Sequence, residues 1–104
     1  IQILNIDEDP VLLIGDFNAE ENSKVIDILI QKLIDTKRDY QIEHKGPVGT
    51  FNNFLNNKEI IKRIDYIFSK GFQTISHQHI DKKRESGDHI SDHLPVFVEV
   101  KIMN

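Results

Sequence analysis

The 104-residue chain contains no cysteine. Without a thiol it forms no disulfide framework, builds no thiolate zinc site and has no cysteine nucleophile. No apolar run approaches the roughly 18 residues that a membrane-spanning helix requires. Positive charge is not in excess either, because 13 Lys and Arg stand against 17 Asp and Glu, which gives a net charge of −4. The chain therefore has no global basic field that would hold nucleic acid by phosphate charge alone.

The residues that are present have the composition of one small globular domain, with 38% hydrophobic and 29% charged residues. The run VLLIG at 11–15 lies between Pro10 and a Gly-Asp turn, and it predicts a strand buried on both faces. Residues 24–36 predict a helix, because apolar side chains recur there at helical spacing. These apolar positions are Ile26, Leu29, Ile30, Leu33 and Ile34, and Asn22 or Ser23 is a suitable N-cap.

Three further strands are predicted after a loop rich in Gly, Pro and Asn at 45–58. RIDYIFS at 63–69 alternates apolar and polar side chains, FQTISHQHI at 72–80 is a looser strand, and LPVFVEVKI at 94–102 alternates again. The order strand, helix, loop and three strands indicates an α+β fold. We expect one mixed β-sheet with an antiparallel part, flanked by the helix.

Polar side chains stand at one end of three of these strands. Asp16 and Asn18 follow the first strand, Asp65 lies at the start of the second, and Asp92 and His93 precede the last. Singly, each has a structural interpretation as a turn, cap or loop residue. If the strands are neighbours in a sheet, however, these groups converge at one edge, where three carboxylates need a cation or a protonated partner.

The residue types in this group are suited to metal-assisted chemistry. Carboxylate and amide oxygens are the donors that a hard divalent cation such as Mg²⁺ prefers. A histidine placed against a carboxylate gains a fixed tautomer and a raised pKa, which suits hydrogen bonding to a phosphoryl oxygen or general acid–base work.

Four motifs together resemble those of one known family. GDFNA at 15–19, GTFNNF at 49–54, RIDYIF at 63–68 and SDHLPV at 91–96 are similar, in order and spacing, to the motif set of the endonuclease/exonuclease/phosphatase superfamily, which has the deoxyribonuclease-like fold. The similarity covers nearly all of residues 1–104. It corresponds to the C-terminal half of a family domain, and so to half of a four-layer α/β/β/α sandwich.

The resemblance implies a phosphate-ester hydrolase that uses Mg²⁺ or Mn²⁺. It implies that Asp16 orients or deprotonates the attacking water and that Asn18 hydrogen-bonds the phosphoryl group or a metal-bound water. Asp92 would help to hold the metal, His93 would bind the scissile phosphate, and Asp65 would hold His93 in its working tautomer. The motifs leave open whether Asp16 or His93 is the base. They also leave the substrate open among nucleic acids, nucleotides and small phosphoesters.

The GTFNNF segment and a nearby loop supply candidate substrate contacts. In relatives a Thr-aromatic pair of this kind lies near the rim of the active site. Phe51 is therefore a candidate to stack on a base or sugar, although a place in the core is the alternative. Asn52 is a further candidate, and His89 could contact a substrate phosphate or simply be a solvated loop residue.

One part of the family pattern is missing from these residues. The metal-binding Glu of the family would lie before Ile1, and no Gln-Glu motif occurs in the chain. We therefore expect the chain by itself to be inactive. The apolar face of its sheet would lack its partner layer, and we expect a homodimer or higher oligomer that packs sheet face on sheet face. The alternative to an enzyme is a family-derived module that binds a partner without turnover.

Two other histidines share one face of a predicted strand, because His77 and His79 are separated by a single residue. A metal-binding pair is one interpretation. Two half-exposed strand histidines are the interpretation that the sequence favours, and His44 has no predicted role.

Overall fold

A computed structural model describes residues 8–103 of the chain. Its elements follow in the order β1, α1, β2, a 3₁₀ helix, β3, β4, β5 and β6. Their bounds are Val11–Asp16, Lys24–Leu29, Ile34–Asp35, Thr36–Arg38, His44–Lys45, Asp65–Lys70, Phe72–His79 and Val96–Ile102. The predicted α+β class is confirmed. Within the described residues, no helix has the length and apolar character needed to cross a membrane.

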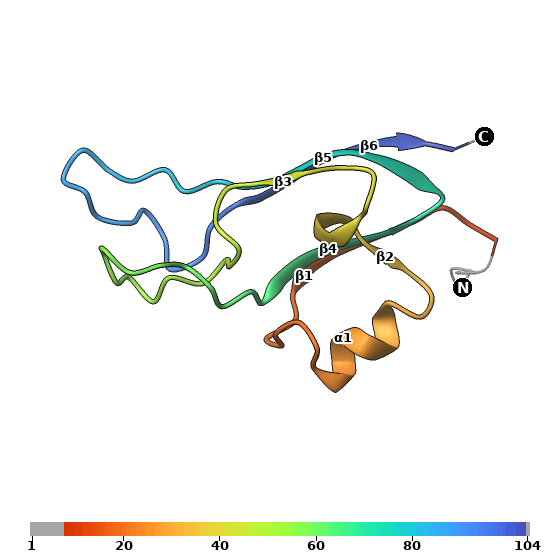
Figure 1. Cartoon of the computed structure of the whole chain (residues 1–104), viewed down its shortest axis with the longest axis horizontal. Coiled ribbons are helices and arrows are strands. Elements are labelled where there is room, and N and C mark those ends of the chain that lie inside the picture. The colour runs from red at the N-terminus through yellow and green to blue at the C-terminus, as the bar shows by residue number, and fades with distance from the viewer. Residues whose placement is uncertain (1–7, 104) are drawn as a thin grey trace, which may run out of the picture.

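Within residues 8–103 the strands form two sheets of three strands, where the sequence predicted a single mixed sheet. β1, β4 and β2 make an antiparallel sheet in the order β1-β4-β2. In the second sheet β5 is central, with β3 parallel and β6 antiparallel to it. Figure 1 shows the two sheets as separate layers, with α1 on the outer side of the first. The chain passes from β4 to β5 through Gly71 alone, at φ +81°, so two consecutive strands enter different layers.

The predicted helix is shorter than its apolar pattern. α1 ends at Leu29, and turns follow it. Ser23 is its N-cap, as expected, and its side chain accepts a hydrogen bond from the backbone N–H of Ile26 at 3.5 Å. The apolar pattern continues past the helix because Leu33 packs into the core and Ile34 begins β2, which pairs with β4. Spacing alone does not separate these two uses of an apolar side chain.

The core lies between the first sheet and α1. Its buried members are Val11, Ile26, Leu33, Tyr66 and Phe68. Phe17 packs edge-on against Tyr66 and Phe68, with ring centroids 5.8 and 5.4 Å away. These contacts fix the chain at the point where it leaves β1, directly after Asp16.

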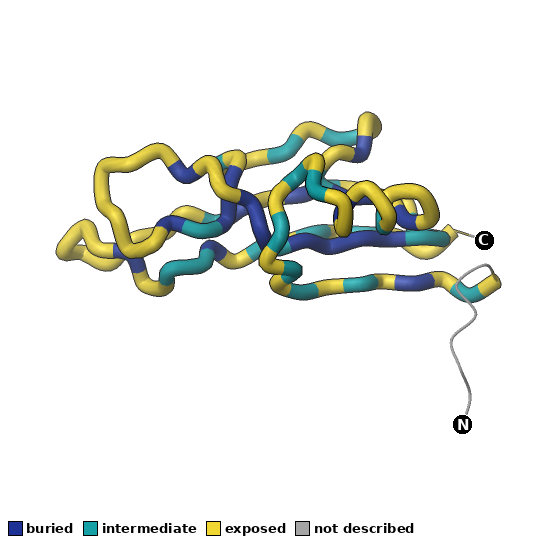
Figure 2. Tube along the Cα trace, turned by 90° about the horizontal axis from the view of Figure 1, so that it is seen from below, coloured by how far each residue is buried: buried dark blue, intermediate teal, exposed yellow. Residues whose placement is uncertain are grey.

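β1 is an edge strand, and the prediction that both its faces are buried is wrong. Leu12 and Ile14 are 41% and 63% exposed, whereas the central strand β4 is buried along four consecutive residues. Figure 2 shows the contrast between the continuous buried stretch of β4 and the tube beside it, along which exposed residues alternate with less exposed ones. The described sheets therefore leave apolar side chains of β1 uncovered.

Two long loops extend past the ends of the strands, at 46–64 and 80–95 (Figure 1). They are joined to each other by backbone hydrogen bonds, from Asn52 N–H to the Asp92 carbonyl at 2.9 Å and from Leu94 N–H to the Thr50 carbonyl at 2.7 Å. Both loops thus return to the end of the first sheet, where β1 ends and β4 begins.

Candidate active site

The end of the β1–β4 pair brings two acidic side chains together. Asp16 and Asp65 are directly opposite each other in the antiparallel register. Like charges at such a pair of positions are unfavourable. The arrangement therefore needs a positive partner at this end of the sheet.

His93 supplies that partner from the loop before β6. Its Nδ1 lies 2.8 Å from Oδ2 of Asp65, and its Nε2 lies 4.0 Å from Oδ2 of Asp16. Since a carboxylate only accepts, Nδ1 must donate, and Nε2 faces Asp16. The hydrogen bond to Asp65 raises the pKa of His93 above its usual value; burial opposes this shift, and the charges of Asp65, Asp92 and Asp16 add to it.

Thr50 and Asn52 hold the segments that carry these groups. The buried Thr50 hydroxyl accepts hydrogen bonds from the backbone N–H groups of Ile64 and Asp65, at 3.1 and 3.2 Å. The side-chain amide of Asn52 donates to the Ser91 carbonyl at 2.9 Å. The GTFNNF segment therefore connects the start of β4 to the SDH motif. Its threonine was not predicted to have this role, since a hydrogen bond to a distant backbone leaves no local signal.

Phe51 is the predicted substrate-contact residue that lies closest to the cluster. Its half-buried ring meets the His93 ring edge-on, with centroids 5.3 Å apart. The Nζ of Lys62 lies 5.5 Å from the centroid of the same ring. Phe51 thus forms one wall beside His93 and carries a cation on its own face.

Asn52 and His89 are both buried inside the loops. Oδ1 of Asn52 accepts from the Phe54 N–H at 2.7 Å, so both the oxygen and the nitrogen of its amide have a partner within the protein. Nε2 of His89 lies 3.1 Å from the Leu55 carbonyl, and its Nδ1 lies 3.8 Å from Asp81. These contacts give both residues a part in joining the loops; contact with substrate stays a prediction.

Asn18 and Asp92 lie beside the cluster. The backbone N–H of Asn18, at φ +51°, donates to Oδ1 of Asp16 at 2.8 Å. Asp92 is half-buried. One ligand atom each from Asp16, Asp65 and His93 lies within 4.8 Å of the other two.

Two cavities adjoin this cluster. The first, about 210 Å³, opens between the sheets and is lined by Ile14, Gly15, Asp16, Asp65, Tyr66, Ile67, Leu94 and Val96. The second, about 220 Å³, lies beside His93 and is mostly apolar, with Ile80, Lys82, His89, Ile90, Ser91, Leu94 and Pro95 as its other lining residues. Open space therefore lies on two sides of the cluster.

The two strand histidines, His77 and His79, are more buried than the sequence predicted. His77 and His79 are each 1% exposed and not half-exposed, because they are on the inner face of β5. His44 on β3 joins them, and one ligand atom from each of the three lies within 4.8 Å of the others. The sequence placed two of these residues on one face but gave no signal for the third.

No protein-family profile matches the chain, and no curated protein matches it. Solved structures do. A functionally unknown conserved protein from Enterococcus faecalis V583 is 37% identical, with a TM-score of 0.85 over 93% of this chain and 38% of that one. The mannosyl-6-phosphatase Bt3783 of Bacteroides thetaiotaomicron VPI-5482 is 30% identical, with a TM-score of 0.75 over 91% of this chain and 39% of that one.

An endonuclease/exonuclease/phosphatase family protein from Bacteroides thetaiotaomicron is also 30% identical, with a TM-score of 0.76 over 91% of this chain and 36% of that one. The chain thus spans less than two fifths of the length of these proteins. Matches of this kind bear out the resemblance that the four motifs predicted, because nearly the whole chain is similar to a part of endonuclease/exonuclease/phosphatase family proteins.

Proposed function

We propose that this chain carries part of the active site of a hydrolase that cleaves phosphate esters by attack of a water molecule on phosphorus, assisted by Mg²⁺ or Mn²⁺. The observation that supports this most is the position of His93 between two carboxylates, 2.8 Å from Asp65 and 4.0 Å from Asp16. A purely structural histidine has no need of two acidic neighbours at the open end of a sheet.

The chain's own residues divide the work. Asp65 holds the Nδ1 proton of His93, so that Nε2 is presented to the substrate. With its raised pKa, His93 carries a proton in a larger share of molecules at neutral pH and donates it toward a phosphoryl oxygen. Asp16, which is exposed, orients or deprotonates the attacking water, and either Asp16 or His93 serves as the base.

The donor set fits a hard divalent cation. Asp16 offers an exposed carboxylate, and Asn18 and Asp92, which follow Asp16 and precede His93 closely in the chain, would supply further oxygens. We propose that these three residues hold the ion, with Asp92 acting directly or through water. A bound Mg²⁺ or Mn²⁺ would polarise the phosphoryl oxygen and neutralise the charge that develops on it.

A complete site needs residues beyond these 104. Each matched structure is from a protein more than twice as long as this chain, which covers 36–39% of them. We propose that a carboxylate outside the described residues completes the metal site, and that the 104-residue chain alone has no turnover.

We also propose that the isolated chain self-associates. Leu12 and Ile14 on β1 are exposed apolar side chains on one face of an edge strand, and a second copy would cover them. The double variant Leu12→Ser/Ile14→Ser should then be monomeric by light scattering at concentrations where the unmodified chain is not. Ile28→Ser, at an equally exposed position on α1, is the matched control and should leave the oligomer intact. A monodisperse monomer of the unmodified chain at high concentration would contradict this proposal.

Hydrolysis is tested on the product of the complete reading frame, beside the 104-residue chain. Substrates are p-nitrophenyl phosphate, bis-p-nitrophenyl phosphate and mannose 6-phosphate, the last because a 30%-identical protein is a mannosyl-6-phosphatase. Turnover should require Mg²⁺ or Mn²⁺, stop with EDTA and fall by about 10²–10⁴-fold in His93→Ala. Lys24→Ala, an exposed substitution on α1, is the control and should keep full activity.

Two results would count against the enzyme. Full activity in His93→Ala would remove the cluster from the chemistry. Substrate-analogue binding without turnover on any ester would favour a binding module of the same family.

A further inference from the structure

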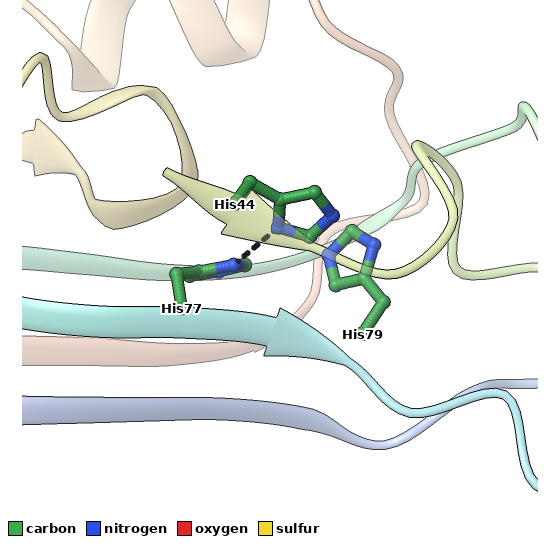
Figure 3. A group of neighbouring side chains, drawn as sticks. All are labelled: His44, His77 and His79. Atoms are coloured by element: carbon green, nitrogen blue, oxygen red, sulfur yellow. Dashed lines mark hydrogen bonds between the residues drawn. The ribbon is translucent and has the colours of Figure 1, made fainter. Parts of the chain in front are cut away.

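We infer that His44, His77 and His79 form a binding site for a late first-row divalent cation, with Zn²⁺ the principal candidate. This site is separate from the acidic cluster at the end of β1 and β4. His44 comes from β3 and is paired in register with His77 of β5, and His79 follows two residues later on the same face. Figure 3 shows the three rings turned toward one another.

The Pro47 carbonyl fixes the tautomers of two of these rings. It lies 2.9 Å from Nε2 of His44 and 2.8 Å from Nδ1 of His79. A carbonyl only accepts, so both nitrogens carry protons, and the lone pairs are left on Nδ1 of His44 and Nε2 of His79. An acceptor on the outer nitrogen of each ring is the arrangement that orients metal-ligating histidines.

His79 directs an unpartnered nitrogen into the group. Its Nε2 is buried and has no hydrogen-bond partner among the described residues. In Figure 3 one nitrogen of this ring points toward His44 and His77, and the other points away. A buried acceptor without a partner costs stability unless something occupies it.

The third ring stands at a distance that suits a shared ion. Nδ1 of His44 and Nδ1 of His77 are 2.9 Å apart, so a single proton lies between them. Two nitrogens bound to a tetrahedral zinc at 2.0–2.1 Å are about 3.3 Å apart. A cation can therefore replace this proton with a shift of a few tenths of an ångström, and the ligand atoms of all three residues already lie within 4.8 Å.

The charge state and the donor type favour the same class of ion. Burial lowers the pKa of His77 to about 3 and that of His79 to about 4, so both rings are neutral at neutral pH, as ligation requires. Three imidazoles without a carboxylate favour Zn²⁺, Cu²⁺ or Ni²⁺ over Mg²⁺ or Mn²⁺.

The backbone holds these ligands in place. Gly46, at φ +91°, lies so close to β5 that a Cβ added there would be 2.0 Å from the His79 carbonyl oxygen. Only glycine permits this approach, which brings Pro47 over both rings. Because β3 has just two residues, an ion shared by β3 and β5 would secure a short pairing. The ion would therefore stabilise the pairing of β3 with β5. His44 is the least buried of the three residues, so the ion and a water ligand would enter from its side.

The experiment compares two histidine variants of chelator-treated protein. Zn²⁺ is titrated in competition with a chromophoric chelator, and Co²⁺ is added separately to read coordination from its visible spectrum. The unmodified protein should bind one Zn²⁺ per chain, and Co²⁺ should give the intense bands of a tetrahedral complex. His44→Ala should weaken Zn²⁺ binding by more than the ~10–100-fold that loss of an outer-shell partner costs. His93→Ala, which removes the histidine of the acidic cluster, is the matched control and should bind Zn²⁺ as before.

A second measurement needs no variant. Zn²⁺ should protect His44 from diethyl pyrocarbonate while His93 is still modified, as mass spectrometry of peptides would show. Absence of stoichiometric Zn²⁺ binding by the unmodified protein would overturn the proposal. So would loss of binding in His93→Ala but not in His44→Ala, or modification of His44 at the same rate with and without Zn²⁺.

Discussion

His93 and His77 lie in two clusters that shift the pKa of a histidine in opposite directions. His93 is about one-third exposed and is hydrogen-bonded to Asp65, which raises its pKa. His77 is 1% exposed and faces two more histidines, and burial lowers its pKa to about 3. His93 is thus suited to carry a proton, and His77 is suited to remain a neutral imidazole that can bind a metal ion.

The difference extends to the ion that each cluster suits. Around His93 the donors are mainly carboxylate oxygens at an open strand end, a set suited to a hydrated hard cation. Around His77 they are ring nitrogens between the sheets, suited to a softer cation. The neighbours of a histidine, supplied by strands far apart in sequence, decide which chemistry it supports.

The largest expected effect comes from removing the carboxylate that orients His93. Asp65→Asn should lower turnover of the complete protein by about 10²–10⁴-fold, because His93 would lose its tautomer and its proton. A merely structural residue would not change the titration of His93. The NMR-measured pKa of His93 should fall in Asp65→Asn, in the 104-residue chain as well as in the complete protein. An unchanged pKa would remove Asp65 from its positioning role.

The next largest effect is the loss of stability expected when the buried ion pair of Arg63 and Asp35 is broken. Arg63 is buried and binds Asp35 through two contacts of 2.5 and 2.6 Å, with Glu21 at 2.9 Å. Arg63→Met should cost about 3–5 kcal/mol of unfolding free energy, because it leaves the Asp35 carboxylate buried and unpaired. Urea denaturation measures this. Lys37→Met, which removes the other cation from Glu21, is the control and should cost far less, about 1 kcal/mol or below.

The buried histidines should make the metal-free protein sensitive to mild acid. Their folded pKa values, about 3 for His77 and about 4 for His79, lie below the unfolded value of 6.5. As pH falls below 6.5 the unfolded chain takes up protons that the folded chain does not, so stability is lost. At pH 5 each histidine should cost about 2 kcal/mol relative to pH 7.5. Unfolding free energies measured with a chelator present should show this loss, and His77→Leu should remove about half of it. Equal slopes in the two proteins would contradict the assignment.

The sequence predicted the acidic cluster of Asp16, Asp65 and His93 better than it predicted the buried histidine cluster. Asp16, Asp65 and His93 each adjoin a strand with a clear apolar pattern, so their convergence could be inferred before the structure. β3 has two residues and no pattern, and its parallel pairing with β5 depends on contacts 33 residues apart. His44 could not be placed for that reason.

The division of the strands into two sheets could not be predicted from the sequence for a similar reason. Strands β4 and β5 have the alternation expected of a hairpin in one sheet. Gly71 turns the chain within one residue, and a Cβ there would lie 3.1 Å from Pro10, so the turn depends on a packing contact that no local pattern records. The helix was predicted too long because the apolar spacing continues through residues that the fold uses as turn and strand.

A smaller effect on stability is expected when a buried threonine hydroxyl is removed. The loss should depend on whether that hydroxyl is hydrogen-bonded to the segments of the acidic cluster. Thr50→Val removes the oxygen that accepts from the N–H groups of Ile64 and Asp65, and should cost about 1–3 kcal/mol. Thr74→Val is the matched control, because the buried Thr74 hydroxyl has no hydrogen-bond partner within residues 8–103. The same substitution there should be neutral or slightly stabilising. Equal losses at the two positions would mean that packing, and not hydrogen bonding, gives Thr50 its importance.

The smallest effect has the opposite sign to that of the buried histidines. Because the folded pKa of His93 is raised, its contribution to stability is fully present below the unfolded value of 6.5 and is lost as pH rises through the folded value. The side chain is 32% exposed, so solvent screens much of the gain. The unfolding free energy of the unmodified chain should therefore exceed that of His93→Gln by more at pH 5.5 than at pH 8.5. A difference that grows with pH would mean that His93 is held neutral, as His77 is, and the contrast between the two clusters would fail.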